Sequence, residues 1–229
     1  MAAAEPFCLM DCSLTRLATG RACFNLRELL DAIRTASDAV LEHHMMRCAL
    51  ENHFELYEFP NDLARWCWTA LGDNVLGEQL GLVDPYQQPS TSALRAALAN
   101  VVEDRLWGLD RAPWCHPGLE LHLIESRLIA YDTGERITTP SALLETIEHM
   151  SLRSLFFHVH EARRRTAGHT DDFSLWLEVS GNAESAESLV TALRGIDFYF
   201  LNLSQLRQAV IEAFRHYFEE APPVARIVS

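Results

Sequence analysis

The sequence matches itself at a shift of 114 residues, and this match limits the folds open to the chain. Residues 14–46 align on 128–160 without a gap, and nine of the 33 aligned positions are identical. Average residue usage would give about two identities by chance. Self-similarity at a nearly fixed shift is the signature of a repeat architecture. We therefore expect an internal duplication, with one repeat at 1–110 and a second at 111–229, packed as one pseudo-twofold unit.

One combination of residues occurs in both repeats. A histidine is followed by an aspartate, and a tryptophan lies four residues after that aspartate. These candidate ligand-binding residues are His44, Asp62 and Trp66 in the first repeat, and His158, Asp172 and Trp176 in the second.

Two interpretations of this combination remain open. In the structural one, each aspartate caps a helix by accepting a backbone N–H, because an apolar run follows it. The tryptophan, one turn later, then faces the core, and the histidine donates a ring N–H to the aspartate. In the functional one, both histidines and both aspartates converge where the repeats meet. Histidine and carboxylate side chains suit metal binding or acid–base chemistry.

A second histidine pattern is confined to the second repeat. His158 and His160 could clamp a metal only from an extended backbone, since on a helix they lie roughly 200° apart. The first repeat has Met46 in place of His160. The nearby run Arg163–Arg165 is the densest positive segment, and its default role is a solvated face, although a phosphate or carboxylate could dock there.

Each repeat is expected to open with a small β-hairpin. In the second repeat Leu119–Tyr131 alternates weakly, and Asp132–Gly134 is a turn signal before a return strand at Arg136–Thr138. The counterpart in the first repeat is Phe7–Ala18, turning at Thr19-Gly20.

Helical periodicity follows each hairpin. Asn25 precedes one apolar stripe as an N-cap, and Thr139 precedes another with Pro140 at the first helical position. Ser37 and Ser151 are expected to cap the helices that carry the two histidines. The fold class is therefore mainly α with a small β element per repeat (α+β).

The remaining segments are a linker and a tail. Residues 107–118 hold two prolines and two glycines and are expected to connect the repeats. The tail from residue 221 is expected to fray.

The charge balance excludes some partners. The net charge is −13, which argues against nucleic acid and against an anionic membrane surface. The start of the chain lacks the features of a signal peptide, and no apolar run approaches the ~20 residues of a membrane span. The six cysteines form no CxxC pair and are interpreted as reduced thiols packed as small apolar groups. We expect a cytoplasmic protein.

The ordered motifs resemble an uncharacterised bacterial and archaeal domain of unknown function. That domain has a Thr-Gly turn, a Leu-rich helix, an HxHR-like stretch and an NDFAxW-like motif. The first repeat supplies Thr19-Gly20, His44 and Asn61–Trp66, and the second supplies Thr133-Gly134 and His158 onward. The resemblance covers nearly the whole chain, twice over, and implies no activity or cofactor.

Two functions follow as hypotheses. No standard enzyme signature, such as GxGxxG, GxSxG or HExxH, is found, which favours a non-enzymatic cytosolic binding or accessory protein. Its partner would be a protein or a small molecule. The alternative is a metal-binding protein or metal-dependent hydrolase with a His/Asp site at the repeat interface.

Overall fold

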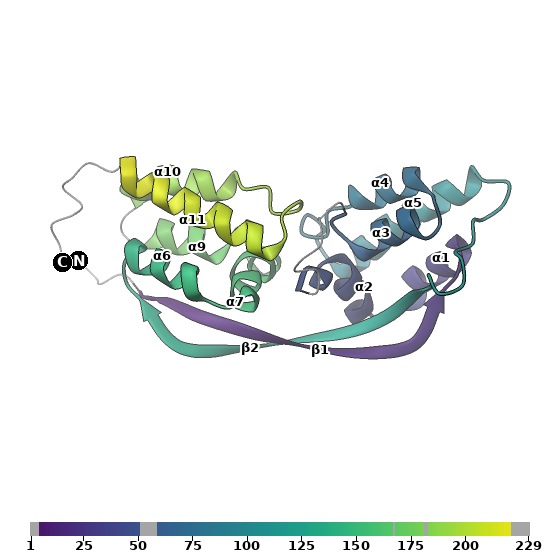
Figure 1. Cartoon of the computed structure of the whole chain (residues 1–229), viewed down its shortest axis with the longest axis horizontal. Helices are drawn as coiled ribbons and strands as arrows, with labels where there is room; N and C mark the ends of the chain where they lie inside the picture. The colour runs from purple at the N-terminus through teal and green to yellow at the C-terminus, as the bar shows by residue number, and fades with distance from the viewer. Residues whose placement is uncertain (1–4, 51–58, 167, 181–182, 221–229) are drawn as a thin grey trace. The chain divides into compact units, whose positions relative to one another are not determined.

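The computed structural model describes residues 5–50, 59–166, 168–180 and 183–220. The chain is mainly helical with one two-stranded antiparallel sheet (Figure 1), as the sequence predicts for the fold class. The residues from 221 onward, expected to fray, lie outside the described residues. Within the described ranges, no helix combines the length and the apolar character that crossing a bilayer requires.

The chain divides into two compact units. Unit 1 comprises Met1–Cys12 and Ala130–Ser229, and unit 2 comprises Ser13–Ile129. The boundaries between them fall inside the two strands, so the first residues of the chain belong with its second half. Packing of the repeats as one pseudo-twofold unit stays a prediction.

The elements of unit 2 follow strand β1, whose first residues belong to unit 1. They are β1 (Phe7–Cys23), α1 (Leu26–Thr35), α2 (Asp38–Met45), the 3-10 helix η1 (Arg47–Leu50), α3 (Asp62–Thr69), α4 (Asn74–Gly81) and α5 (Thr91–Trp107). Helix α1 packs on α5, and α3 packs on α4.

The elements of unit 1 follow strand β2, whose first residues belong to unit 2. They are β2 (Leu121–Ile137), α6 (Pro140–His149), α7 (Leu152–Phe156), the π-helix η2 (Phe157–Glu161), α8 (Ala162–Arg165), α9 (Asp172–Val179), α10 (Ala183–Arg194) and α11 (Leu203–Glu220). Helix α10 packs between α9 and α11, and α11 also contacts α6 and α7.

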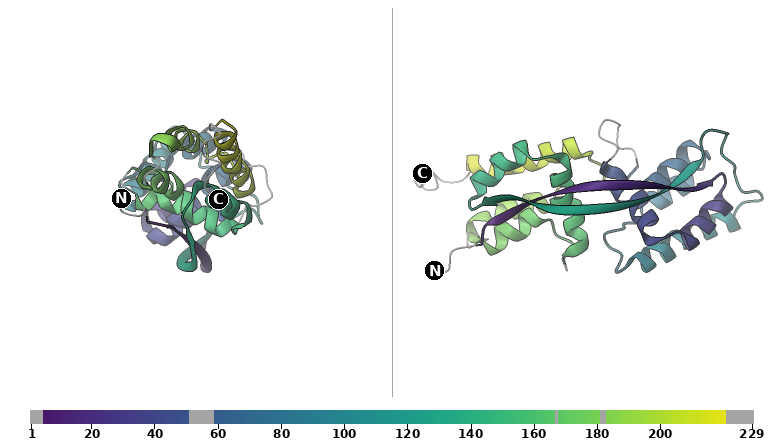
Figure 2. Two further views of the ribbon diagram at one scale, coloured as in Figure 1. Left: turned by 90° about the vertical axis from the view of Figure 1, so that its left-hand side faces the viewer. Right: turned by 90° about the horizontal axis from the view of Figure 1, so that it is seen from below.

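The predicted β-hairpins are wrong. Each turn signal lies inside a continuous strand of 17 residues, and the two strands pair with each other (Figure 2). Gly20 and Gly134 do take the positive φ that a turn would use, 75° and 86°, but here the left-handed glycine bends a strand that continues. Thr19 and Thr133 fix the bend, since each hydroxyl accepts an N–H two residues on and donates to the other strand.

The strand contacts define the register. Thr19 donates to the carbonyl of Leu123, and Thr133 donates to the carbonyl of Leu9, at 2.8 Å each. The residue numbers of each pair give the same sum, as antiparallel pairing requires. The burial patterns along β1 and β2 differ at a single position.

The helix starts test the predicted caps. Asn25 accepts N–H groups of α1, and Thr139 caps α6 with Pro140 at its start, as predicted. Ser37 and Ser151 occupy the predicted N-cap positions, although only Ser151 accepts a backbone N–H there.

The predicted capping role of Asp62 and Asp172 is wrong. The caps are the preceding residues, Asn61 and Asp171, which accept the N–H groups of Ala64 and Ser174. An N-cap residue keeps an extended backbone, and it is Asn61 and Asp171 that do so. Asp62 and Asp172 are the first helical residues, and their carboxylates are left for other partners.

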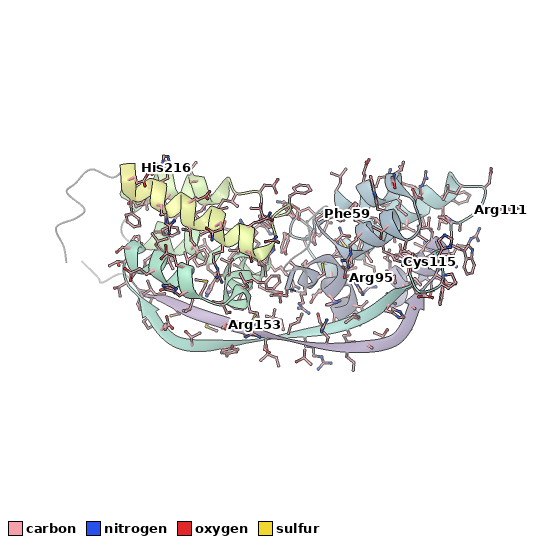
Figure 3. All side chains as sticks on the ribbon, viewed as in Figure 1. Phe59, Arg95, Arg111, Cys115, Arg153 and His216 are labelled. Carbon is pink, nitrogen blue, oxygen red and sulfur yellow. The ribbon has the colours of Figure 1, made fainter. Side chains whose placement is uncertain are left out.

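The last helix of each unit carries an arginine that hydrogen-bonds the segment joining two earlier helices of that unit. Arg95 of α5, labelled in Figure 3, donates to the carbonyl of Ile33 and to Asp38. Arg207 of α11 donates to the carbonyl of Met150. These bonds place the N-terminal ends of the histidine-bearing helices.

Candidate binding site

His44 lies on α2 in unit 2 and has a partner at each ring nitrogen. Its Nδ1 is 2.9 Å from Oδ2 of Asp62, and its Nε2 is 3.1 Å from the backbone nitrogen of Ile124 on β2. Its side chain is 3% exposed, so water does not compete for either contact.

His158 lies on η2 in unit 1 and has the corresponding partners. Its Nδ1 is 2.8 Å from Oδ2 of Asp172, and its Nε2 is 3.0 Å from the backbone nitrogen of Met10 on β1. Each histidine is therefore paired with the aspartate of its own unit. Convergence of the four side chains at the repeat interface stays a prediction.

These contacts fix the tautomer of both rings. A backbone N–H can only donate, so Nε2 of His44 and of His158 must offer a lone pair. The ring proton then sits on Nδ1, from which it is donated to the aspartate. In this state both ring nitrogens are used, and neither is left to bind a metal or to exchange a proton with a substrate.

The two tryptophans are buried, at 6% exposed for Trp66 and 7% for Trp176, as the structural interpretation predicts. Each indole N–H donates to a backbone carbonyl in its own unit, that of Leu119 for Trp66 and that of Glu5 for Trp176. A buried indole N–H needs such a partner. The tryptophans thus hold the segments that lead into β2 and β1.

Each aspartate also accepts an arginine. Arg65 of α3 donates to Asp62 at 2.7 Å, and Arg165 of α8 donates to Asp172 at 2.8 Å. The positive run of unit 1 is therefore largely committed to internal contacts. Arg163 is buried, with its guanidinium over the ring of Phe198. Arg164 and Arg165 are exposed, so the solvated face expected from the sequence holds for two of the three arginines.

A hollow of about 320 Å³ lies beside His44 in unit 2. Its wall combines imidazole, carboxylate and guanidinium groups with Trp66, Thr69 and Cys48. The ionisable side chains of the wall are His43, His44, Asp62, Arg65, Glu120 and His122. This mixture can hydrogen-bond a small polar molecule from several sides.

The matching surroundings of His158 in unit 1 are aromatic. The ring centroid of Phe7 is 4.8 Å from that of His158, and those of Phe157 and Phe173 are at 5.4 and 5.6 Å. Phe157 directly precedes His158 in the sequence, as His43 precedes His44. A polar ring in unit 2 thus stands where unit 1 has an apolar one.

His43 was missed by the sequence reasoning, although it is adjacent to His44. Burial, and next the neighbouring His44, lower the pKa of His43 from 6.5 to about 4. His43 is therefore a neutral wall residue at pH 7. The contrast between His43-His44 and Phe157-His158 in the aligned repeats was a signal that could have singled it out. Glu120 and His122 lie about 80 residues away in the sequence and gave no such signal.

Three potential metal ligands lie together in the wall of the hollow. One ligand atom from each of His43, His44 and Asp62 lies within 4.8 Å of the others. Zinc would need a lone pair on His44, and its Nε2 lone pair is directed at the N–H of Ile124 while Nδ1 carries the proton. A metal bound through Nε2 of His44 would therefore displace the hydrogen bond from Ile124, so the donor set does not fit a metal as it stands.

The His158 and His160 pair lies on the π-helix η2, so the extended backbone required for a metal clamp is not formed. His160 stacks on Phe156 at 5.1 Å and meets Phe198 edge-on at 5.3 Å. Burial lowers its pKa to about 3. These contacts place His160 in the core of unit 1.

The fold and this site together define a mainly helical protein in which a histidine–aspartate pair holds a strand within each compact unit. The chain belongs to a family of unknown function (DUF5752), whose model matches residues 4–215. This agrees with the resemblance to an uncharacterised domain.

A solved structure, that of OrfY from Thermoproteus tenax, is similar to this chain. The TM-score is 0.72 at 26% sequence identity, and the match covers 95% of this chain and 97% of that one. No match was found among the curated proteins.

Proposed function

We propose that this is a non-enzymatic cytosolic binding protein built from two duplicated helical repeats, with its ligand site in the hollow beside His44. The observation that carries the proposal is the hollow itself, a polar cavity bordered by a histidine–aspartate pair whose hydrogen-bonding groups are already used. The His44–Asp62 pair already uses its hydrogen-bonding groups on the protein itself, which favours binding over catalysis by this pair.

The duplication is supported by contacts that correspond between the units. His44 and His158 each accept a backbone N–H from a strand and each meet an aspartate. The strand residues that donate, Ile124 and Met10, lie 114 positions apart, the same shift that aligns the repeats. A shared ancestor explains this correspondence with the fewest assumptions.

The cytosolic location is supported by the cysteines. None of the six forms a disulfide, and four of them are buried. Buried thiols outside disulfides are typical of proteins from a reducing compartment.

The second candidate function is a metal-binding protein or metal-dependent hydrolase. The cluster of His43, His44 and Asp62 is the observation in its favour. Zinc titrated into the full chain in a calorimeter tests it, with His43→Gln and His44→Gln as variants. Saturable binding that both variants remove would favour the metal protein over the small-molecule binder.

The ligand site is tested by filling the hollow. Ala70 lines it, and Ala70→Phe should close it. The matched control is Ser180→Phe, because Ser180 follows α9 in unit 1 as Ala70 follows α3. A library of small polar metabolites is screened against the full chain by saturation-transfer NMR.

The proposal predicts at least one metabolite whose signal is lost with Ala70→Phe and kept with Ser180→Phe. If every metabolite that binds the parent chain binds Ala70→Phe equally well, the hollow is not the ligand site.

A further inference from the structure

We propose that unit 1 carries a binding site for an extended β-strand, and that a second copy of the chain can supply this strand through its own residues 5–12. In the structure the site holds residues 5–12 of the same chain. We call it the strand clamp and define it by Thr133, Ser151, Ser154, His158 and Trp176. The inference does not depend on the ligand site of unit 2.

The clamp binds the backbone of the strand. The indole N–H of Trp176 donates to the carbonyl of Glu5 at 3.0 Å. Met10 is held at both of its backbone groups, since its N–H donates to Nε2 of His158 at 3.0 Å and its carbonyl accepts the hydroxyl of Ser154 at 2.6 Å. Backbone contacts of this kind are how proteins take up a strand from another chain.

Two further side chains extend the contact on both sides of Met10. The hydroxyl of Thr133 donates to the carbonyl of Leu9 at 2.8 Å. The hydroxyl of Ser151 donates to the carboxylate of Asp11 at 3.0 Å. The bound segment is therefore held along nearly its whole length.

The side chains of the segment fit the same site. Phe7 and Leu9 are each 5% exposed, and Cys12 is fully buried. The Phe7 ring lies 5.6 Å from that of Phe173 and 6.0 Å from that of Trp176. The clamp thus selects an extended segment with an aromatic residue and an aliphatic residue two positions later.

The second copy is the partner because it carries the fitting strand. The covalent link between the segment and the clamp runs through the whole of unit 2, Ser13–Ile129, so within unit 1 non-covalent contacts alone hold the segment. Exchange of residues 5–12 between two copies would keep every contact described above. Swapping of an identical element is a low-cost route to a dimer for this reason.

The test uses two full-length variants in a Cys8→Ser, Cys115→Ser background. One chain carries Asp11→Cys, and the other chain carries Ser151→Cys and a different affinity tag. These two positions are chosen because the side chains of Asp11 and Ser151 are hydrogen-bonded to each other. The chains are unfolded together in urea, refolded and treated with a short thiol–thiol cross-linker. The control partner carries Arg215→Cys, on α11 of the same unit.

The proposal predicts a cross-linked heterodimer of the Asp11→Cys and Ser151→Cys chains, at least fivefold above the control pair. A single chain with both substitutions reports closure within one molecule. If that chain cross-links internally while the mixed pair stays at the control level, exchange between copies is overturned. Exchange is also overturned if a synthetic peptide of residues 5–12 binds the refolded chain while the mixed pair gives no dimer. The clamp would then accept a separate strand but not the strand of a second copy.

The unsubstituted chain provides an independent measurement. After refolding at increasing concentration, size-exclusion chromatography should show a growing dimer fraction that does not dissociate on dilution. A monomer at every refolding concentration would contradict the proposal.

Discussion

Met10 and His158 lie 148 positions apart in the sequence and are joined by a 3.0 Å hydrogen bond from backbone N–H to imidazole Nε2. Ile124 and His44 make the same bond in unit 2 at 3.1 Å. In both units the second ring nitrogen meets an aspartate. The histidine of each repeat therefore links a helix, a strand and a carboxylate, and its role in the fold follows from these bonds.

Replacement of the unit 1 histidine should destabilise the protein. His158→Asn is expected to lower the free energy of unfolding by ~2–4 kcal/mol, because the backbone N–H of Met10 loses its acceptor and Asp172 loses one of its two donors. His149→Asn is the control, since His149 is exposed, and should stay within about 0.5 kcal/mol. Urea unfolding followed by circular dichroism measures both. An unchanged midpoint for His158→Asn would contradict the linking role.

Two variants of Trp66 in unit 2 distinguish the contribution of packing from that of hydrogen bonding. Trp66→Phe should cost ~1 kcal/mol for the bond to the Leu119 carbonyl, and Trp66→Ala should cost ~3–5 kcal/mol because it also leaves a cavity. Trp107→Ala serves as the control, since that side chain is 88% exposed. Thermal unfolding ranks the three variants. Equal losses for Trp66→Ala and Trp107→Ala would show that Trp66 is not a core residue.

Stability should fall in mild acid because of the buried histidines. Burial lowers the pKa of His43 from 6.5 to about 4 and that of His160 to about 3. Below pH 6.5 the unfolded chain therefore binds protons that the folded chain does not, and the free energy of unfolding decreases as the pH falls towards 4. Each histidine contributes a slope of up to ~1.4 kcal/mol per pH unit in this window.

The variant His43→Gln isolates one of these contributions. Urea midpoints between pH 7 and pH 4.5 should fall less steeply for His43→Gln than for the parent chain, and Trp107→Ala, which removes no ionisable group, should leave the slope unchanged. Identical slopes for the parent and His43→Gln would mean that His43 titrates normally in the folded protein.

Local spacing was enough to predict much of this fold. The helix starts at Asn25 and Thr139 were predictable, because a cap acts within its own turn. The pairing of His44 with Asp62 and the burial of Trp66 were also predictable. Trp66 lies one turn after Asp62 on α3, which restricts where its side chain can point. The pairing of His44 with Asp62 was suggested by the recurrence of both residues in the two repeats.

The extended segments were predicted from local signals, but their continuation through the turn signals and their pairing with each other were not. The sequence Asp132-Thr133-Gly134 is compatible both with a turn that reverses the chain and with a bend in a strand that continues. The outcome depends on the bond from Thr133 to Leu9, 124 positions away. The wall of the hollow is non-local for the same reason, since His122 reaches it from β2. Sequence spacing carries no information on such contacts without an alignment.

His44 and His158 serve as structural links with their proton on Nδ1. Long-range proton–nitrogen correlation NMR on the 15N-labelled full chain measures this directly, because it distinguishes protonated from unprotonated ring nitrogens. At pH 7 we expect both rings to have a protonated Nδ1 and an unprotonated Nε2, and equimolar zinc to leave their signals in place. A proton on Nε2 of either ring, or a zinc-induced shift of their nitrogens, would contradict it.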